Sequence, residues 1–164
     1  MTIDLRPLGA GDLPFARTML LASMVPAPEG DPEEILARPE NHKYVDGWGR
    51  PGDRGFVASI DSADAGATWY RLFPASAPGY GFVDESTPEI STLAVVPAQR
   101  RRGVGAKLLA AAIDAARADG FFALSLSVNR ENGAAVALYT RAGFVEREDV
   151  ASSNEDSVTM LLAL

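Results

Sequence analysis

The sequence predicts a single α/β domain in which a mixed β-sheet carries helices on both faces. Three observations support this fold class. The length of 164 residues suits one domain. The composition, with 47% hydrophobic and 23% charged residues, is that of a globular protein. Patterns of strand and helix follow in the order strand, helices, several strands, helix, strand, helix and two strands, which is typical of a sheet between helices.

The first elements are a strand and a helix. Ile3 and Leu5 alternate with polar residues, which predicts a strand over residues 2–8. Asp12 then precedes an apolar run that predicts a helix from Leu13 to Met24. Its early proline is tolerated because N–H groups in the first turn have no helical partner.

Residues 25–55 differ in character from the rest of the chain, because prolines, glycines and charges dominate them. Asp31 as N-cap, a proline after it and Glu34 as the closing residue of a capping box predict a short helix to about Arg38. A second short helix is expected near 40–47. The segment is too short for a second domain, and either a substrate-facing lid or an insertion without a role in the site fits its composition.

The central strands come next. Strands are predicted over 55–60 and 66–73, and turn residues join them. A loop rich in proline and glycine follows at 74–79. A strongly apolar strand is then expected over 89–96, ending at Pro97 because proline cannot continue a central ladder.

The C-terminal part alternates helices and strands. Apolar residues at spacings of three and four predict a helix over 103–119, which ends at a glycine. The elements after it are a buried strand over 121–128, a helix over 130–141 that ends before Gly143, and two strands over 144–149 and 157–164.

Composition excludes several kinds of site. The chain has no cysteine and one histidine, His42, so a disulfide, a thiolate zinc site and a cysteine nucleophile are excluded and no metal is expected. The net charge of −7 opposes binding to nucleic acid. No apolar run approaches the roughly 20 residues that span a bilayer, and the N-terminus lacks a signal-peptide pattern. A cytoplasmic protein without membrane contact is therefore expected.

The segment RRRGVGA, from Arg100 to Ala106, is the most informative part of the chain. Glycine lets the backbone approach a ligand, and the first N–H groups of a helix are unpaired at the positive end of its dipole. The segment therefore predicts an anion site that suits phosphate. No P-loop string occurs, and Leu108 stands where the dinucleotide fingerprint needs its third glycine. A tight turn with solvated arginines is the alternative.

Two motifs resemble those of the GNAT superfamily of acetyl-CoA-dependent N-acetyltransferases. Residues 95–105 (VVPAQRRRGVG) are similar to V-x-P-x-x-R-x-x-G-x-G, and residues 128–144 are similar to V-x-x-x-N-x-x-A-x-x-L-Y-x-x-x-G-F. The resemblance implies one N-acetyltransferase-like domain over 1–164, with an acetyl-CoA-binding core over 89–145. It also implies a mostly antiparallel sheet in which the two strands at the cofactor slot splay apart.

The resemblance further implies roles for particular residues. The backbone of Leu93, Ala94 and Val95 would pair with the pantetheine arm. Asn132 would hydrogen-bond the cofactor, and Tyr139 would be the general acid near the sulfur. Asn132 as a helix cap and Tyr139 as a core residue are the alternatives. The pyrophosphate would lie on the turn residues Arg100, Arg101, Arg102, Gly103, Val104, Gly105 and Ala106.

The implied reaction moves an acetyl group from acetyl-CoA to a primary amine by direct transfer in a ternary complex. A base must take a proton from the acceptor, because an aliphatic amine with a pKa of about 10.4 is almost fully protonated at neutral pH. Glu89 is the candidate by resemblance, and Asp84 and Glu85 lie just upstream. Glu89 as an exposed charge at a strand edge is the alternative.

The acceptor is not identified by the sequence. Some relatives that acetylate protein N-termini have a glutamate where this chain has Ser127, which favours a small molecule over a protein. The candidates for the acceptor pocket are Trp48, Trp69, Tyr70, Arg71 and Tyr80. The adjacent Trp69 and Tyr70 face opposite sides of a strand, and core packing suits both.

A non-catalytic acyl-CoA-binding regulatory domain is the alternative function. A homodimer is compatible with the resemblance.

Overall fold

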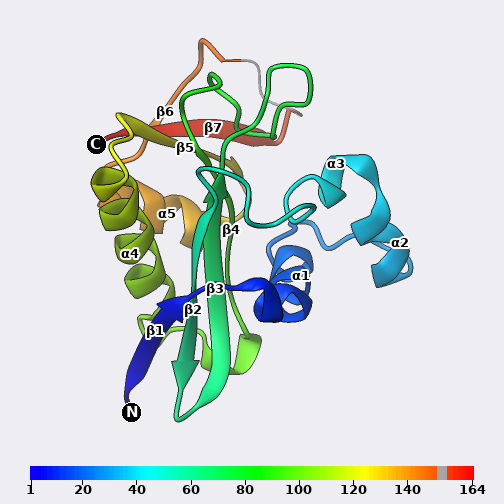
Figure 1. Ribbon diagram of the computed structural model, residues 1–164, viewed down its shortest axis with the longest axis vertical. Helices are drawn as coiled ribbons and strands as arrows, with labels where there is room; N and C mark the ends of the chain where they lie inside the picture. Colours follow the sequence, from blue (N-terminus) through cyan, green and yellow to red (C-terminus); the bar gives the residue numbers. More distant parts are fainter. Residues whose placement is uncertain (151–154) are drawn as a thin grey trace.

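A seven-stranded sheet forms the centre of the computed structural model, which describes residues 1–150 and 155–164 (Figure 1). The strands lie in the order β1-β2-β3-β4-β5-β7-β6. Every neighbouring pair is antiparallel except β4 and β5, which are parallel. The predicted mixed, mostly antiparallel sheet is therefore confirmed. The strands are β1 (Ile3–Pro7), β2 (Arg54–Ile60), β3 (Ala63–Arg71), β4 (Glu89–Val95), β5 (Ala123–Asn129), β6 (Val145–Glu146) and β7 (Ser157–Ala163).

Helices cover both faces of this sheet (Figure 1). On one face, α4 and α5 pack against β5 and β7 in the largest hydrophobic cluster. On the other face, α1 packs against β2, β3 and β4 in a second cluster. The helices are α1 (Leu13–Ala22), α2 (Pro32–Ala37), α3 (Pro39–His42), α4 (Val104–Ala118) and α5 (Gly133–Ala142), with short 3-10 turns at Ala10–Asp12 and Pro97–Gln99. In the described part of the chain, none of these helices is long and apolar enough to cross a membrane.

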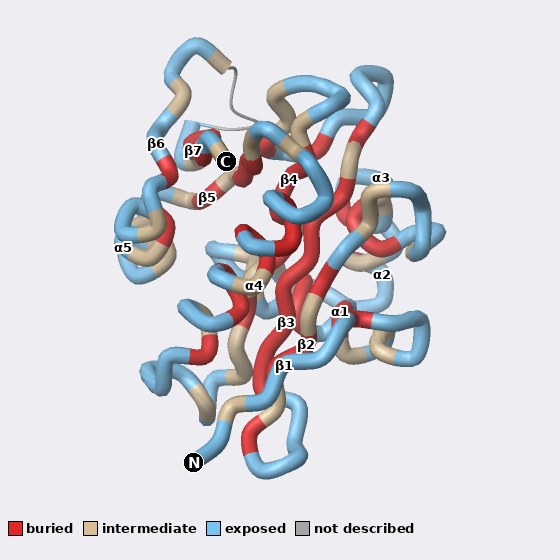
Figure 2. The backbone as a smooth tube through the Cα atoms, turned by 60° about the vertical axis from the view of Figure 1, so that its left-hand side comes forward, coloured by how far each residue is buried: buried red, intermediate tan, exposed pale blue. Residues whose placement is uncertain are grey.

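Buried residues follow the central strands and the inward side of α4 (Figure 2). Trp69 packs in the cluster beneath α1, and Tyr70 packs in the cluster beneath α4 and α5. Adjacent residues of a strand point to opposite faces, so the prediction that these two aromatics face opposite sides and both serve the core is confirmed.

Some elements end earlier or begin later than the sequence predicted. The helix expected over 130–141 begins at Gly133, because the Asn132 side chain caps it by accepting a hydrogen bond from a first-turn N–H at 3.3 Å. The strand expected over 144–149 is limited to Val145–Glu146. The helix expected to reach Met24 ends at Ala22, and the second short helix is only four residues long.

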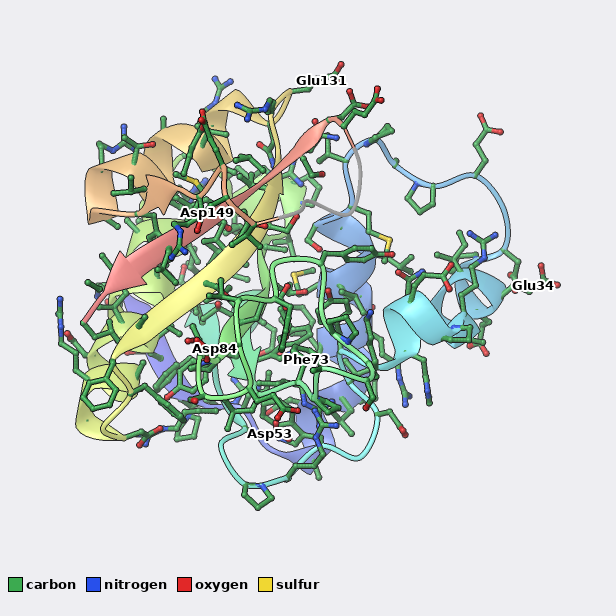
Figure 3. The ribbon with its side chains drawn as sticks, turned by 90° about the horizontal axis from the view of Figure 1, so that it is seen from above. Glu34, Asp53, Phe73, Asp84, Glu131 and Asp149 are labelled. Atoms are coloured by element: carbon green, nitrogen blue, oxygen red, sulfur yellow. The ribbon has the colours of Figure 1, made fainter. Side chains whose placement is uncertain are left out.

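The segment before β2 is held to the sheet by buried polar contacts. Arg71 in β3 donates from Nε and Nη2 to both carboxylate oxygens of Asp53, each at 2.8 Å, and from Nη1 to the carbonyl of Lys43 at 3.1 Å. Trp69 Nε1 donates to the carbonyl of Tyr44 at 2.9 Å. These bonds fix Tyr44 over the sheet. Seen from above (Figure 3), Asp53 lies close to the sheet, whereas Glu34 lies at the outer end of α2.

Candidate active site

The central feature of the site is a split between β4 and β5. These two strands share a single register pair, Glu89 with Ser125. On its other side, β4 is paired with β3 along its length. Beyond Glu89, the edge of β4 that faces β5 therefore lacks a partner strand.

The alternation of backbone groups decides which peptide groups of β4 face the open edge. The N–H of Val96 donates to a carbonyl oxygen of β3 at 2.7 Å. Since neighbouring residues in a strand present their N–H and C=O to opposite sides, the peptide groups of Ala94 face β3 and those of Leu93 and Val95 face the split. In keeping with this, the Val95 carbonyl accepts a bond from the Arg100 side chain at 3.2 Å. Of the three predicted backbone contacts, Leu93 and Val95 have peptide groups that face the split, although the Val95 carbonyl is already bonded to Arg100.

The predicted anion-binding turn lies directly after this edge. Arg101 has a φ of 64° and Gly103 a φ of 84°, both left-handed, and they turn the chain from the strand into α4. Gly103 is the N-cap of α4 and supplies no side-chain cap to the first turn. The N–H groups of Val104, Gly105 and Ala106 therefore have no acceptor within the helix.

Gly105 is not required by the packing of the protein. A Cβ on Gly105 would be 3.6 Å from Leu138 in α5 and 3.9 Å from Val95, which are ordinary contact distances. The missing side chain instead leaves space at the start of α4, between β4 and α5. This space and the open N–H groups fit a pyrophosphate that lies close to the backbone.

The arginines of the turn are exposed. The side chain of Arg100 folds back onto β4, and Arg102 Nη1 lies 3.5 Å from the sulfur of Met1. Together with Arg101 they place three cationic groups around the start of α4, in a chain whose net charge is −7. Positive charge at a helix N-terminus is unfavourable for the helix dipole, so this cluster is better suited to a bound anion than to helix stability.

Helix α5 carries the other two predicted cofactor residues. Asn132 serves as its N-cap, which is the structural alternative considered for this residue. Tyr139 is buried, and its ring packs edge-on against Phe144 with centroids 5.8 Å apart. Burial raises the pKa of Tyr139 above its ordinary value. The phenol therefore holds its proton at neutral pH more firmly than an exposed tyrosine does.

Glu89 lies at the closed end of the split, and it is buried with 2% of its surface exposed. The alternative of an exposed strand-edge charge is therefore wrong. Its Oε1 accepts bonds from the N–H of Gly81 at 2.7 Å and from the hydroxyl of Tyr44 at 3.4 Å. Its Oε2 is buried and has no hydrogen-bond partner among the described residues. Burial raises the pKa of Glu89 to about 7, although the bond from Gly81, the charge of Lys43 and the Tyr44 hydroxyl act in the opposite direction.

Two glycines of the loop between β3 and β4 allow this burial. A Cβ on Gly79 would overlap Oε2 of Glu89, and a Cβ on Gly81 would overlap the backbone of Leu126 in β5. Gly81 therefore lets the loop cross the backbone of β5, and Gly79 leaves room for the carboxylate of Glu89 in its buried position. The loop shields the Glu89 carboxylate from solvent and supplies the N–H that binds it.

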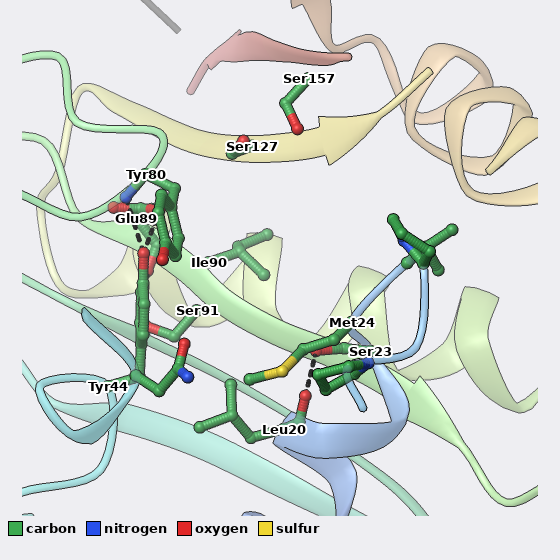
Figure 4. A pocket seen from close by; sticks show the side chains of 14 residues that line it. Leu20, Ser23, Met24, Tyr44, Tyr80, Glu89, Ile90, Ser91, Ser127 and Ser157 are labelled. Carbon is green, nitrogen blue, oxygen red and sulfur yellow. Dashed lines mark hydrogen bonds between the residues drawn. The ribbon is translucent and has the colours of Figure 1, made fainter. Parts of the chain in front are cut away.

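A cavity of about 280 Å³ opens beside Glu89 (Figure 4). Its walls come from the end of α1, the proline-rich segment after it, α3, the loop between β3 and β4, and the strands β4, β5 and β7. Tyr44 and Tyr80, whose rings stack with centroids 5.9 Å apart, form one end together with Glu89. The predicted pocket residue Tyr80 is thus in place, whereas Trp48, Trp69, Tyr70 and Arg71 do not line the cavity.

Tyr44 was not predicted as a site residue. Its hydroxyl accepts the N–H of Tyr80 at 2.6 Å and donates to Glu89. No spacing or motif in the sequence indicates this contact, which joins residues 45 positions apart. Asp84 and Glu85, the other candidate bases, instead bond to backbone N–H groups of their own loop and do not line the cavity. His42 is exposed.

A sequence model described as the acetyltransferase (GNAT) family matches residues 18–144 of this chain. The "Mycothiol acetyltransferase" of Renibacterium salmoninarum is 32% identical over 92 residues, which are 55% of this chain and 26% of that protein. The "[Ribosomal protein bS18]-alanine N-acetyltransferase" of Salmonella typhimurium is 36% identical over 88 residues, 50% of this chain and 58% of that protein. The chain thus spans about a quarter and just over half of the length of these two relatives.

Solved structures share the whole fold. The PaiA N-acetyltransferase of Thermoplasma acidophilum, solved in complex with coenzyme A, superposes with a TM-score of 0.72. The match covers 100% of both chains at 17% sequence identity. At this identity the likeness concerns the fold alone.

Proposed function

Because this chain belongs to the acetyltransferase (GNAT) family, we propose that it transfers an acetyl group from acetyl-CoA to the primary amine of a small molecule, directly and in a ternary complex. The observation that carries the proposal is the split between β4 and β5. It has an open peptide edge along β4, an uncapped helix N-terminus at one end and a buried carboxylate at the other.

The residues around the split fit the cofactor. The peptide groups of Leu93 and the N–H of Val95 face the split and are offered to the pantetheine arm, and the turn from Arg100 to Ala106 offers N–H groups and cationic side chains to the pyrophosphate. The amide of Asn132, at the start of α5, is proposed as a further contact. When bound, acetyl-CoA supplies an acetyl thioester, whose C–S bond breaks as a C–N bond to the amine forms.

Glu89 is proposed as the general base. A pKa of about 7 leaves a substantial fraction of the carboxylate ionised at neutral pH, and it still allows a proton to be accepted readily. Its side chain lines the cavity in which an acceptor amine would lie. Gly81 and Tyr44 hold the carboxylate in place, so it accepts the proton of the acceptor nitrogen, directly or through a water molecule.

Tyr139 is proposed as the general acid that protonates the departing thiolate. We expect Tyr139→Phe to lower kcat by about 100-fold, at the low end of the contribution of general acid–base catalysis. The phenyl ring keeps its packing against Phe144, so Tm and binding of acetyl-CoA change little. The measurement is steady-state thiol release. Tyr70→Phe is the control, because the Tyr70 hydroxyl bonds to Asp119 outside the split. Equal losses in both variants contradict the role.

Binding of acetyl-CoA is tested by thermal unfolding. At a concentration 100 times its Kd, acetyl-CoA should add about 2.7 kcal/mol to the free energy of unfolding, which raises Tm by several degrees. Gly105→Glu should abolish this rise, because a carboxylate would then occupy the start of α4. Ala118→Glu adds the same charge at the far, exposed end of that helix and should retain the rise.

The outcomes of this experiment separate the candidate functions. No rise in Tm at millimolar acetyl-CoA contradicts the proposal, and the turn is then purely structural. A rise that depends on Gly105, without thiol release for any amine, instead favours the acyl-CoA-binding regulatory domain. A rise with thiol release in the presence of an amine supports the transferase.

A further inference from the structure

The residues that line the cavity beside Glu89 indicate the chemical class of the acceptor. We propose that the acceptor is a small primary monoamine with an uncharged body, which has one apolar side and carries a neutral hydrogen-bonding group such as a hydroxyl or an amide. This inference rests on the proposed function, because it assumes that the amine enters this cavity.

The first argument is the charge of the cavity wall. Glu89 is the single ionisable carboxylate or cationic group among the residues that line it. The four residues outside the described part of the chain, 151–154, are Ala-Ser-Ser-Asn and carry no charge. A carboxylate or phosphate on the acceptor would therefore lose its water without gaining a cationic partner, and it would lie near the charge of Glu89.

Lys43, the cation that acts on Glu89, is already engaged. Its Nζ donates to the carbonyl of Pro78 and lies over the rings of Tyr80 and Tyr44, 5.2 and 5.7 Å from their centroids. It does not line the cavity. A second ammonium on the acceptor is equally disfavoured, because Glu89 is the sole lining carboxylate and the reacting amine uses it.

The second argument is a row of hydroxyl groups on one side of the cavity. Ser127 in β5 and Ser157 in β7 line it (Figure 4). The strand register, which pairs Ser127 with Thr159, places these side chains on one face of the sheet. Ser125 and Thr159 extend this row beyond the cavity lining, and their buried hydroxyls have no hydrogen-bond partner among the described residues. Within the cavity, the hydroxyls of Ser127 and Ser157 can donate or accept, which suits a neutral hydrogen-bonding group.

A bulge in β4 adds a third hydroxyl. Tyr70 of β3 pairs with Ile90 of β4, and its neighbour Trp69 pairs with Thr92. Ser91 lies between these two pairs and is therefore the extra residue of the bulge in β4. Consecutive residues of a regular strand face opposite sides, yet Ile90 and Ser91 both line the cavity. The bulge therefore turns the Ser91 side chain toward the cavity.

The opposite wall is largely apolar. Leu20 of α1 and Met24 after it face the cavity (Figure 4), and Val25 and Pro26 also line it. The polar residues of this wall are already bonded, the Ser23 hydroxyl to the carbonyl of Leu20 at 2.7 Å and the Asn41 amide N–H to the carbonyl of Ile35 at 2.8 Å. An acceptor that fills this space has one side against hydrocarbon and the other against hydroxyls. The volume of about 280 Å³ lies at the lower limit of small-molecule sites, which hold about 300–1,000 Å³, so the part of the acceptor that lies in the cavity is small.

The test uses a series of five-carbon amines that differ at the far end. We expect kcat/KM for 5-amino-1-pentanol and 5-aminopentanamide to exceed that for 5-aminopentanoate and 1,5-diaminopentane by at least about tenfold. The amine is four or five carbons from the varied group, so its own protonation is similar throughout. Binding is measured in parallel, as the rise in Tm that each amine produces in the presence and in the absence of CoA.

A charge-reversal variant sharpens the test. Ser157→Lys places a cation at the partly exposed start of β7, and it should raise kcat/KM for 5-aminopentanoate relative to 5-amino-1-pentanol by about tenfold or more. Ser157→Met, of similar length and without charge, removes the same hydroxyl and should not raise this ratio. Both variants should keep the rise in Tm with acetyl-CoA.

Several outcomes overturn the inference without affecting the proposed function. Equal or better use of the two charged amines is one, and acetyl-CoA binding without binding of any amine of the series is another. A nonapeptide with a free N-terminus that is acetylated at least tenfold faster than 5-amino-1-pentanol excludes the small acceptor. Failure of the proposed function is different, because acetyl-CoA then gives no rise in Tm, while amine binding in the cavity is still measurable.

Discussion

Replacing Glu89 with glutamine should lower kcat/KM for acetyl transfer by about 10²–10⁴-fold, the usual contribution of a general base. Glutamine keeps the shape of the side chain and can still accept the N–H of Gly81, but it cannot take a proton. In the native protein the ionised carboxylate is the active form. The ratio of the native rate to that of the variant should therefore rise as pH increases through about 7 and then level off.

The same variant gives a readout that does not depend on catalysis. Burial raises the pKa of Glu89 from 4.5 to about 7, so the folded state holds the proton at a pH where the unfolded state has lost it. The native protein should thus lose stability as pH rises from about 4.5 to about 7, by on the order of 3 kcal/mol from this group. Glu89→Gln should lack this loss, so its stability relative to the native protein should increase across this window.

Glu85→Gln is the matched control for both measurements. Glu85 lies in the loop just before β4, but it is exposed and does not line the cavity. Activity and its pH profile should be those of the native protein. If Glu85→Gln loses as much activity as Glu89→Gln, or if the ratio of the native rate to that of Glu89→Gln does not rise near pH 7, Glu89 is not the base.

Asp53→Asn should cost about 3–5 kcal/mol of stability, because it leaves the guanidinium of Arg71 buried without an opposite charge. The Arg71 side chain is fully buried and that of Asp53 is 2% exposed. Asparagine retains an oxygen for the N–H groups of Gly49 and Arg50, which bond to the carboxylate at 2.9 Å. The loss therefore reports mainly on the charge. Thermal or urea unfolding measures it, and a fall in Tm of roughly 6–20 °C is expected.

Asp149→Asn provides the comparison. Arg147 and Asp149 form the same two-bond contact, with both distances 2.7 Å, but on the surface and away from Asp53 (Figure 3). Water replaces the lost partner there, so Tm should hardly change. If both variants lose similar stability, burial does not explain the contribution of the Arg71–Asp53 ion pair to the free energy of unfolding. Replacing Arg71 and Asp53 together by methionine and leucine should recover part of the stability.

The sequence predicts the parts of this protein that depend on local patterns. Apolar spacing identifies the strands and α4, and the glycines at 103 and 105 mark the turn between β4 and α4. Each of these features is encoded by residues that are close in the chain, so short-range preferences decide them. The ends of α1 and α5 were less well predicted, because a single side chain such as Asn132 decides where a helix begins.

The surroundings of Glu89 could not be predicted in the same way. Its burial depends on the loop of Gly79 and Gly81, which passes across it, and on Tyr44 from a segment 45 residues upstream. The bulge at Ser91 depends on the register between β3 and β4. Such contacts are set by tertiary packing. An acidic residue at the start of a strand gives no local signal that it will be buried.

The two halves of the site are built from different kinds of structure. The slot proposed for acetyl-CoA uses β4, α4 and α5, whereas the cavity is walled largely by the end of α1, the prolines at 26 and 28, and the loop that carries Tyr80. Loops tolerate substitution and insertion better than the strands and helices that they connect. Acceptor specificity can therefore diverge by exchange of these connecting segments while the donor chemistry is inherited unchanged. Grafting residues 23–28 and 74–82 between related proteins is accordingly the direct engineering route to a new acceptor.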